Sequence, residues 1–177
     1  GTISLGGGYG TTSGFSIFTD LAENNLFGNG QRVGVKFEYG PSRTAITLSF
    51  DERWFMDYPV GFSTSIFYYL YNIETSSLFA NDTNYSYYDK QAFGYTMGFS
   101  YRFWYYYTVG FTWGHTFKSY LNPTGNAPDE VFQSVAQGIQ EKRTLTLYTY
   151  RDSKDNYLNP TSGSRVGMAV GFSGGYL

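Results

Sequence analysis

Alternation of apolar residues with small or polar ones, at a period of two, is the feature that most constrains the fold of this chain. In Arg32–Tyr39 it places Val, Phe and Tyr on one face and Arg, Gly, Lys and Glu on the other. Phe93–Tyr101, Tyr107–Phe117 and Arg165–Ser173 repeat it, and their second face is almost entirely Gly, Ala, Ser and Thr. Because successive side chains of a strand point to opposite faces, these segments predict β-strands with one apolar face.

Weaker alternation brings the number of predicted strands to nine. The additional segments are Thr2–Gly10, Gly14–Glu23, Thr44–Asp51, Val60–Tyr71 and Arg143–Arg151. None of the nine has the 3.6-residue periodicity of an amphipathic helix. The pattern therefore predicts an all-β chain.

The residues of the second face separate a membrane barrel from a soluble one. A soluble sandwich or lipocalin-like barrel turns its apolar face inward and its charges to water, and its surface carries roughly 25 to 35% charged residues. Here only 15% of all residues are charged, whereas 38 are aromatic. No run of about 18 apolar residues offers a transmembrane helix. We therefore predict an antiparallel transmembrane β-barrel of the outer membrane, with Trp54, Trp104 and Trp113 near strand ends as part of its aromatic girdles.

The connections between the predicted strands divide into two groups. Turns rich in Gly, Pro, Asn and Asp are expected on the periplasmic side: Asn24–Gly30, Asp51–Pro59, Phe103–Tyr106 and Ser153–Ser164. The long polar segments Ile73–Lys90 and Tyr120–Lys142 are expected outside the cell, together with the short connections Thr11–Ser13 and Pro41–Arg43.

Nine strands do not complete a barrel. An open sheet in lipid leaves two rows of unpaired backbone groups, each group costing several kcal/mol, and bacterial single-chain barrels have even strand numbers. The chain starts on a predicted strand without a signal peptide and stops at Gly174–Leu177. We expect both ends to be internal to a longer protein that supplies the remaining strands.

Three segments carry a resemblance to a known family: Gly8–Gly14, Asn25–Gly30 and Tyr157–Arg165. In order, in spacing and in register with the strand count, they are similar to the barrel of the BamA family of outer-membrane assembly factors, over essentially the whole chain. Each also has a structural explanation as a glycine-containing turn. The resemblance implies that residues 1–177 are strands one to nine of a sixteen-stranded barrel. The periplasmic POTRA domains and the C-terminal barrel half, with its inward-folded Arg-Gly loop, are not in this chain.

The resemblance also implies a function: insertion and folding of β-barrel proteins into the bacterial outer membrane. The partners it implies are outer-membrane lipids, unfolded outer-membrane β-barrel substrates, the remaining half of the same barrel and accessory assembly lipoproteins. Alternatives are a related polypeptide-translocating barrel, of the two-partner secretion or the translocation-and-assembly type, and a passive porin or channel. A further alternative is an adhesin-like barrel that binds surface partners through its two long loops.

The candidate functional site is the backbone of the first strand. Its residues are Ile3, Ser4, Leu5, Gly6, Gly7, Gly8, Tyr9 and Gly10. An edge strand offers a row of N–H and C=O groups to an incoming strand, and four glycines weaken its packing and raise the entropic cost of ordering it. We expect this strand to form a lateral gate that pairs with the closing strand of substrate barrels, with Ile3, Leu5 and Tyr9 toward lipid. The alternative is a glycine-rich strand permanently paired with the last strand.

No residue pattern predicts an enzyme, a cofactor or a metal site. The only histidine, His115, falls on the apolar face and is expected to be an interface aromatic rather than a general base. The Asn81–Asn84 stretch, with Asp82 and Asp89, lacks the ligand spacing of a calcium loop and is expected to be a solvated loop. The formal charge of −2 disfavours nucleic-acid binding.

Charged residues on the predicted strands are expected to line a wet lumen as paired charges. They are Asp20, Glu38, Asp152, Arg32, Lys36 and Arg165. The chain has no cysteine, so disulfides and thiolate metal sites are excluded.

Overall fold

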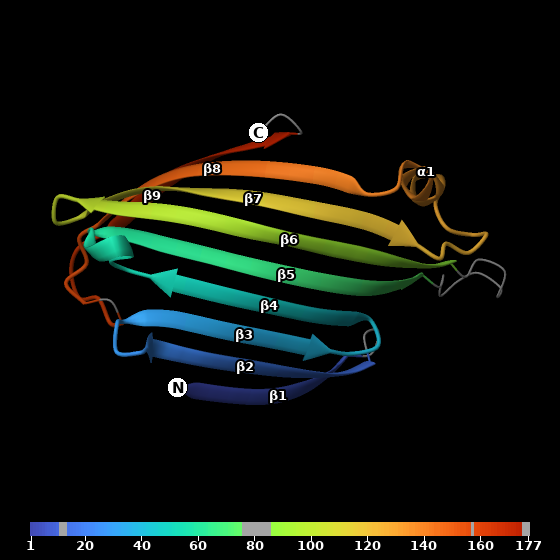
Figure 1. Cartoon of the computed structure of the whole chain (residues 1–177), viewed down its shortest axis with the longest axis horizontal. Helices are drawn as coiled ribbons and strands as arrows, with labels where there is room; N and C mark the ends of the chain where they lie inside the picture. The colour runs from blue at the N-terminus through green and yellow to red at the C-terminus, as the bar shows by residue number, and fades with distance from the viewer. Residues whose placement is uncertain (11–13, 76–85, 157, 175–177) are drawn as a thin grey trace.

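A computed structural model describes residues 1–10, 14–75, 86–156 and 158–174, which form one curved antiparallel sheet (Figure 1). Its nine strands lie side by side in chain order, so that β1 and β9 are the two edges. The strands are β1 (Thr2–Gly10), β2 (Gly14–Leu26), β3 (Gln31–Tyr39), β4 (Arg43–Glu52), β5 (Val60–Thr75), β6 (Ser86–Phe103), β7 (Tyr107–Leu121), β8 (Gln140–Asp152) and β9 (Arg165–Gly174). All nine predicted strands are confirmed.

The strands next to the two long connections extend farther than the alternation predicted. β5 continues to Thr75, and β6 begins at Ser86 rather than at Phe93. β7 continues to Leu121, and β8 begins at Gln140. These added strand segments carry polar residues on both faces. The apolar alternation therefore stops, although the main-chain hydrogen bonding between the strands continues.

A helix occupies part of Tyr120–Lys142, where we predicted only a loop. Helix α1 (Asp129–Gln137) begins after Pro128 with two acidic residues in its first turn, which favour a helix N-terminus, and it ends at Gly138 with φ +74°. Helix α1 contacts β7, and Val131 is its buried residue. A short 3-10 helix, η1 (Phe55–Asp57), lies in the β4–β5 connection at the other end of the sheet. Neither helix of the described residues is long and apolar enough to cross a membrane.

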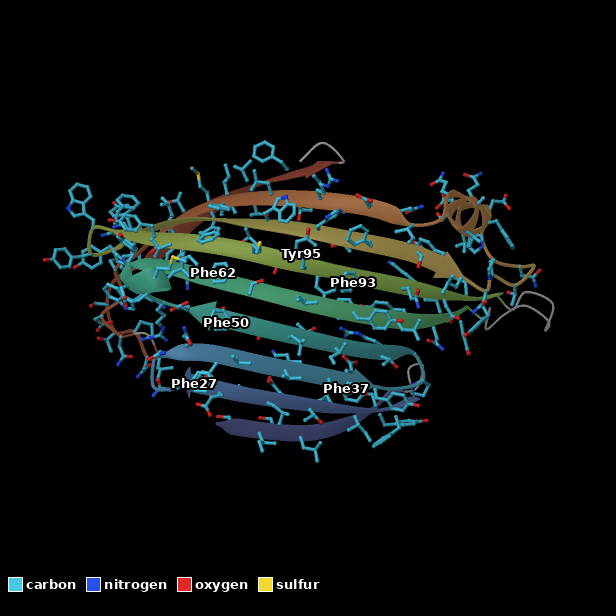
Figure 2. The ribbon with its side chains drawn as sticks, viewed as in Figure 1. Phe27, Phe37, Phe50, Phe62, Phe93 and Tyr95 are labelled. Carbon is cyan, nitrogen blue, oxygen red and sulfur yellow. The ribbon has the colours of Figure 1, made fainter. Side chains whose placement is uncertain are left out.

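The strand register gathers most of the apolar residues of the nine strands on one side of the sheet, called here the apolar face. One unbroken row across it is Val33, Phe50, Thr64, Met97, Trp113, Leu145 and Phe172. Figure 2 labels five residues of this face: Phe50, which belongs to that row, and Phe37, Phe62, Phe93 and Tyr95. In the described part of the chain no second layer covers this face, and no large side chain is fully buried. The apolar face is therefore an exposed surface of the described sheet.

The opposite side, called here the polar face, has rings lying across glycines of the neighbouring strand. Phe18 is paired with Gly6, Phe67 with Gly94 and Tyr148 with Gly110. A Cβ atom at these three glycines would come within 2.2, 2.6 and 2.4 Å of the respective ring. The glycines therefore make room for cross-strand rings, a device that holds strands in register.

The three tryptophans do not all lie near strand ends. Trp54 follows β4, and Trp104 lies exposed in the β6–β7 turn, as predicted. Trp113 is in the middle of β7, opposite Met97 and Leu145, so its predicted place near a strand end was wrong. The reason is that β7 runs four residues beyond Phe117.

Candidate functional site

Strand β1 is an edge of the sheet along its whole length. Every residue from Thr2 to Gly10 pairs with β2, in an unbroken register that runs from Thr2 opposite Ala22 to Gly10 opposite Gly14. No other strand of the described residues pairs with β1. One side of its backbone is therefore open to an additional strand.

The side chains of β1 do little to hold it to the sheet. Ile3, Leu5 and Tyr9 project from the apolar face and are 79, 76 and 78% exposed. Within the described residues, no side chain of Thr2–Gly10 makes a hydrogen bond, ion pair or ring pair with β2, although the ammonium of Gly1, directly before β1, lies 3.0 Å from the Glu23 carboxylate of β2. Apart from the ion pair at Gly1, the main-chain ladder and the ring of Phe18 over Gly6 hold this strand to the described sheet.

Other neighbouring strands have side-chain links across the polar face. Lys36 on β3 lies 3.5 Å from Asp20 on β2, and Arg43 on β4 lies 3.0 Å from Glu38 on β3. Cation–π contacts join Arg43 to two tyrosines of β5 as well.

The second edge strand also has such a link. Arg165 on β9 lies 3.8 Å from Asp152 on β8, and its guanidinium is 4.7 Å from the centre of the Tyr150 ring. The two edges of the sheet therefore differ: a side chain of β9 forms an ion pair with β8, whereas the ion pair at the β1 edge comes from the Gly1 ammonium and not from a side chain of Thr2–Gly10.

The glycines of β1 differ in the space around them, which the sequence alone does not show. Gly6 leaves room for Phe18. At Gly7 an added Cβ would make ordinary contacts, at 3.4 Å from the Phe15 ring and from the Ser16 carbonyl oxygen. At Gly8 it would meet nothing within 4 Å. Of Gly6, Gly7 and Gly8, only Gly6 has a ring in the space that a Cβ would occupy.

The first two motifs that carried the family resemblance are turns. In the first, Gly14 has φ +71°, whereas residues 11–13 lie outside the described residues. In the second, the Asn25 side-chain oxygen accepts a hydrogen bond from the Gly30 amide at 2.7 Å. Phe27, Gly28 and Gly30 all have positive φ there, and the Phe27 ring is exposed. Both motifs have the structural role predicted for them.

The third motif belongs to a β8–β9 loop organised by Asp155. The Asp155 carboxylate accepts hydrogen bonds from the Thr161 hydroxyl and from the amides of Asn156, Thr161 and Ser162. Ser153 and Ser164 close the loop through two further hydrogen bonds that involve the Ser153 hydroxyl, both at 3.1 Å. Tyr157 lies outside the described residues. Asp155 precedes the motif and was not singled out from the sequence, although an Asp before a Pro-containing turn is a known turn signal.

The order of this loop is expected to depend on pH through Asp155. Hydrogen bonds from the Thr161 hydroxyl, and then from backbone amides, hold the pKa of this carboxyl well below its usual range. Because the pKa is lowered in the folded loop, the stabilisation is present above the ordinary carboxyl pKa of about 3.9 and is lost as the pH falls below it. Hydrogen exchange should show protected Thr161 and Ser162 amides at neutral pH and progressive loss of protection below about pH 4.

The matched control for this prediction is Asp155→Asn in the full-length parent, which keeps one acceptor oxygen and removes the charge. Protection of the same amides should be lower in the variant and independent of pH in that range. Equal protection in the two proteins at neutral pH would contradict the role of the carboxylate.

The charges predicted to line a lumen all lie on the polar face. Asp20 pairs with Lys36, Glu38 with Arg43 and Asp152 with Arg165. Arg32 lies opposite Asp51 and makes no ion pair within the described residues. Pairing is therefore confirmed for five of the six predicted residues, and Arg43 is the partner that the sequence did not single out.

His115 lies in an aromatic cluster of the apolar face and is only 8% exposed. Its ring centroid is 4.2 Å from that of Phe117, and Tyr95 and Trp113 also contact it. Its Nε2 is 3.2 Å from a Glu141 carboxylate oxygen. His115 therefore packs as one ring of an aromatic cluster on the apolar face, where the sequence predicted an interface aromatic.

A metal centre has no support from the described residues, among which no group of three potential ligands gathers. Asp89 instead accepts hydrogen bonds from Tyr87 and Asn122. The Asn81–Asn84 segment with Asp82 lies outside the described residues.

The family is decided by comparison with known proteins. The Omp85 superfamily domain matches residues 25–177, which is most of the sheet. The chain belongs to the Omp85 superfamily. It is 26% identical over 179 aligned residues to the outer membrane protein assembly factor BamA of Neorickettsia risticii (strain Illinois). That alignment covers 98% of this chain and 22% of the relative.

A solved Omp85 structure shows the same fold. The crystal structure of BamA from Haemophilus ducreyi lacking POTRA domains 1–3 superposes with a TM-score of 0.64 at 18% identity, covering 98% of this chain and 34% of that one. The chain thus spans about a third of the solved relative's length and less of the curated one.

Membership in the Omp85 superfamily confirms several expectations. The chain is part of an integral β-barrel of the outer membrane, so the apolar face is the side that meets lipid and the polar face is the inner wall. The prediction that the chain is not an enzyme agrees with a family of assembly factors.

Proposed function

We propose that this Omp85 chain is the N-terminal wall of a barrel that inserts and folds other β-barrel proteins, and that β1 is its lateral gate. The observation that carries the proposal is the state of β1, a full-length edge strand that the described residues hold by its main-chain ladder, one ring and the ion pair of the preceding Gly1 ammonium with Glu23. The relative from Neorickettsia risticii, which is named an outer membrane protein assembly factor, supports the activity.

Pairing with an open edge solves the physical problem of an incoming strand. A strand that enters lipid with unpaired N–H and C=O groups pays several kcal/mol for each of them. Strand addition to β1 would satisfy these groups through main-chain hydrogen bonds, largely independently of the substrate's side-chain sequence. A gate must also release its product, and a strand without side-chain links separates more easily than one with ion pairs.

The remaining features of the proposal follow from the family. The η1 end of the sheet, with its short turns, is the periplasmic end, and the α1 end is the outer end. The rest of the parent protein supplies POTRA domains before β1 and the strands that close the barrel after β9. Unfolded outer-membrane barrels are the substrates, accessory assembly lipoproteins are partners, and outer-membrane lipid covers the apolar face.

Two serines at opposite edges of the sheet offer a matched test. Ser4 on β1 and Ser173 on β9 both lie on the polar face, opposite Asp20 and Thr144 respectively. In the full-length parent, Ser4→Cys is expected to form a disulfide with a cysteine placed in the closing strand of a substrate barrel during insertion. Ser173→Cys is expected not to do so, because β9 is covered by the next strand of the closed barrel.

The measurement is the yield of mixed disulfide on non-reducing gels, with a folded substrate as a further control. Equal yields from both positions, or none from Ser4→Cys, would contradict the gate. A parent that transports substrates without cross-linking to β1 would instead fit the two-partner secretion or porin alternative.

A further inference from the structure

Three lysines lie near the outer end of the polar face on adjacent strands: Lys90 on β6, Lys118 on β7 and Lys142 on β8. Lys118 is opposite Ala92 and Gln140, each two residues from one of the other lysines. Lys90 and Lys142 are therefore diagonal neighbours of Lys118, a relation that places residues about 7–8 Å apart. We call the three residues the lysine patch.

The lysine patch has no carboxylate partner. None of its members makes an ion pair with any part of the chain that the structure describes. Lys90 contacts the ring of Tyr120, with Nζ 5.9 Å from its centre, and Lys118 experiences the positive charges of both neighbours. Like charges at diagonal positions repel each other, and a bound anion would offset this repulsion.

Of the acidic residues described near this end, Glu74, Asp89 and Glu141 lie on the apolar face, and Asp129 and Glu130 of α1 form no ion pair with the lysine patch. Glu141 is on the apolar face, where it contacts His115 and Arg143. Asp89 is also on that face and accepts hydrogen bonds from Tyr87 and Asn122. By contrast, Lys36 and Arg43 on the polar face both have carboxylate partners. The lysine patch is therefore an unbalanced positive region of the inner wall.

We propose that the lysine patch binds a carboxylate-bearing segment of the parent protein's remaining barrel. The polar face becomes the inner wall once the barrel closes, so a group that reaches the patch comes through the lumen rather than from lipid. Because this chain spans only 34% of the solved relative, the rest of the protein must complete that lumen. Tyr88 and Tyr120, whose rings pair at 6.1 Å on the same face, add phenol groups that can donate hydrogen bonds to a carboxylate.

The test reverses the central charge in the purified full-length parent. If an acidic segment occupies the patch, Lys118→Glu lowers the midpoint of thermal unfolding, read from the gel shift of the folded barrel, by about 2 °C or more. Lys118→Arg keeps the wild-type midpoint, and 1 M NaCl shrinks the difference between Lys118→Glu and wild type because salt screens the contact. Barrel stability is the readout, so the result does not depend on insertion activity.

The opposite sign overturns the proposal. Without an acidic occupant, Lys118→Glu would place a negative charge between two lysines and raise the midpoint. If Lys118→Glu does not fold, Lys118→Gln is tested in its place. Lys118→Gln lowers the unfolding midpoint when an acidic segment occupies the patch, and raises it when the substitution only removes repulsion between lysines. A wild-type midpoint that rises on addition of inorganic phosphate, with no rise in Lys118→Gln, would assign the patch to a free anion and also overturn the proposal.

Discussion

Proline at Gly7 and proline at Gly8 are expected to impair insertion of a substrate barrel unequally when each is placed in the full-length parent. Successive residues of an antiparallel edge strand direct their N–H groups alternately to the paired strand and to the free edge. Proline removes its N–H and fills that space with its ring. The variant whose proline faces the free edge should lose insertion rate by on the order of tenfold, since one main-chain hydrogen bond contributes about 1 kcal/mol and the ring adds a steric block.

The matched controls are Gly7→Ala and Gly8→Ala. An added Cβ has ordinary contacts at Gly7 and open space at Gly8, so both alanine variants should insert substrate at close to the wild-type rate. Gly6 is unsuitable for this test, because a Cβ there would come within 2.2 Å of the Phe18 ring, which would have to move.

Insertion is measured as the appearance of heat-modifiable, protease-resistant substrate barrel in liposomes that contain the parent. The variant whose proline faces β2 should show the smaller defect, because it weakens the β1–β2 ladder and leaves the free edge intact. Normal insertion by both proline variants would contradict the pairing of substrate strands with β1.

Gly163→Ala is expected to destabilise the parent barrel by about 3 kcal/mol, by combining backbone strain with lost hydrogen bonds. Gly163 has φ +93°, a conformation that L-residues rarely adopt, and a Cβ there would come within 2.1 Å of the Ser153 carbonyl oxygen. Rotation of a side chain does not relieve a clash with backbone. The loop must therefore open, breaking the contacts between Ser153 and Ser164.

The control for Gly163→Ala lies on the strand that follows. Gly171→Ala in β9 places a Cβ 3.9 Å from the nearest atom, the Thr146 hydroxyl oxygen, and should change stability by no more than about 0.5 kcal/mol. Urea titration of the folded barrel, followed by its gel shift, compares the two variants. Equal midpoints for Gly163→Ala and wild type would show that the β8–β9 loop is not held as the structure describes.

The strands could be predicted because their signal is local. Alternation depends only on the two faces of a single strand, one toward lipid and one toward the inner wall, so each segment reports its own state. The signal fails where that contrast ends. The outer parts of β5 through β8 have polar residues on both faces, and their ladder continues where the alternation does not.

The α1 helix was missed for a related reason. It is a single short helix in a polar connection. Two acidic residues at its start and a glycine at its end are weak signals of its boundaries. Its contact with the end of β7 supports it, and this contact is tertiary.

The candidate site was predicted only in part. The glycine content of β1 is visible in the sequence and indicated a weak strand. The distinction between Gly6, Gly7 and Gly8 was not visible, because it depends on Phe18 and Phe15 of the next strand. Likewise, the lysine patch joins residues 52 positions apart in the chain, from Lys90 to Lys142, which become neighbours only through two strand pairings.

By itself, the sequence determined an all-β membrane wall of nine strands, its apolar face and its glycine-rich first strand, because a strand's period of two is written into consecutive residues. Tertiary structure alone decided which glycine accommodates a ring, which charges pair and which remain unbalanced. It also decided that β1 lacks the side-chain links that hold β9. The physical reason is register: the side chains that meet across a sheet are set by pairing between strands, and no single strand encodes its neighbour's alignment.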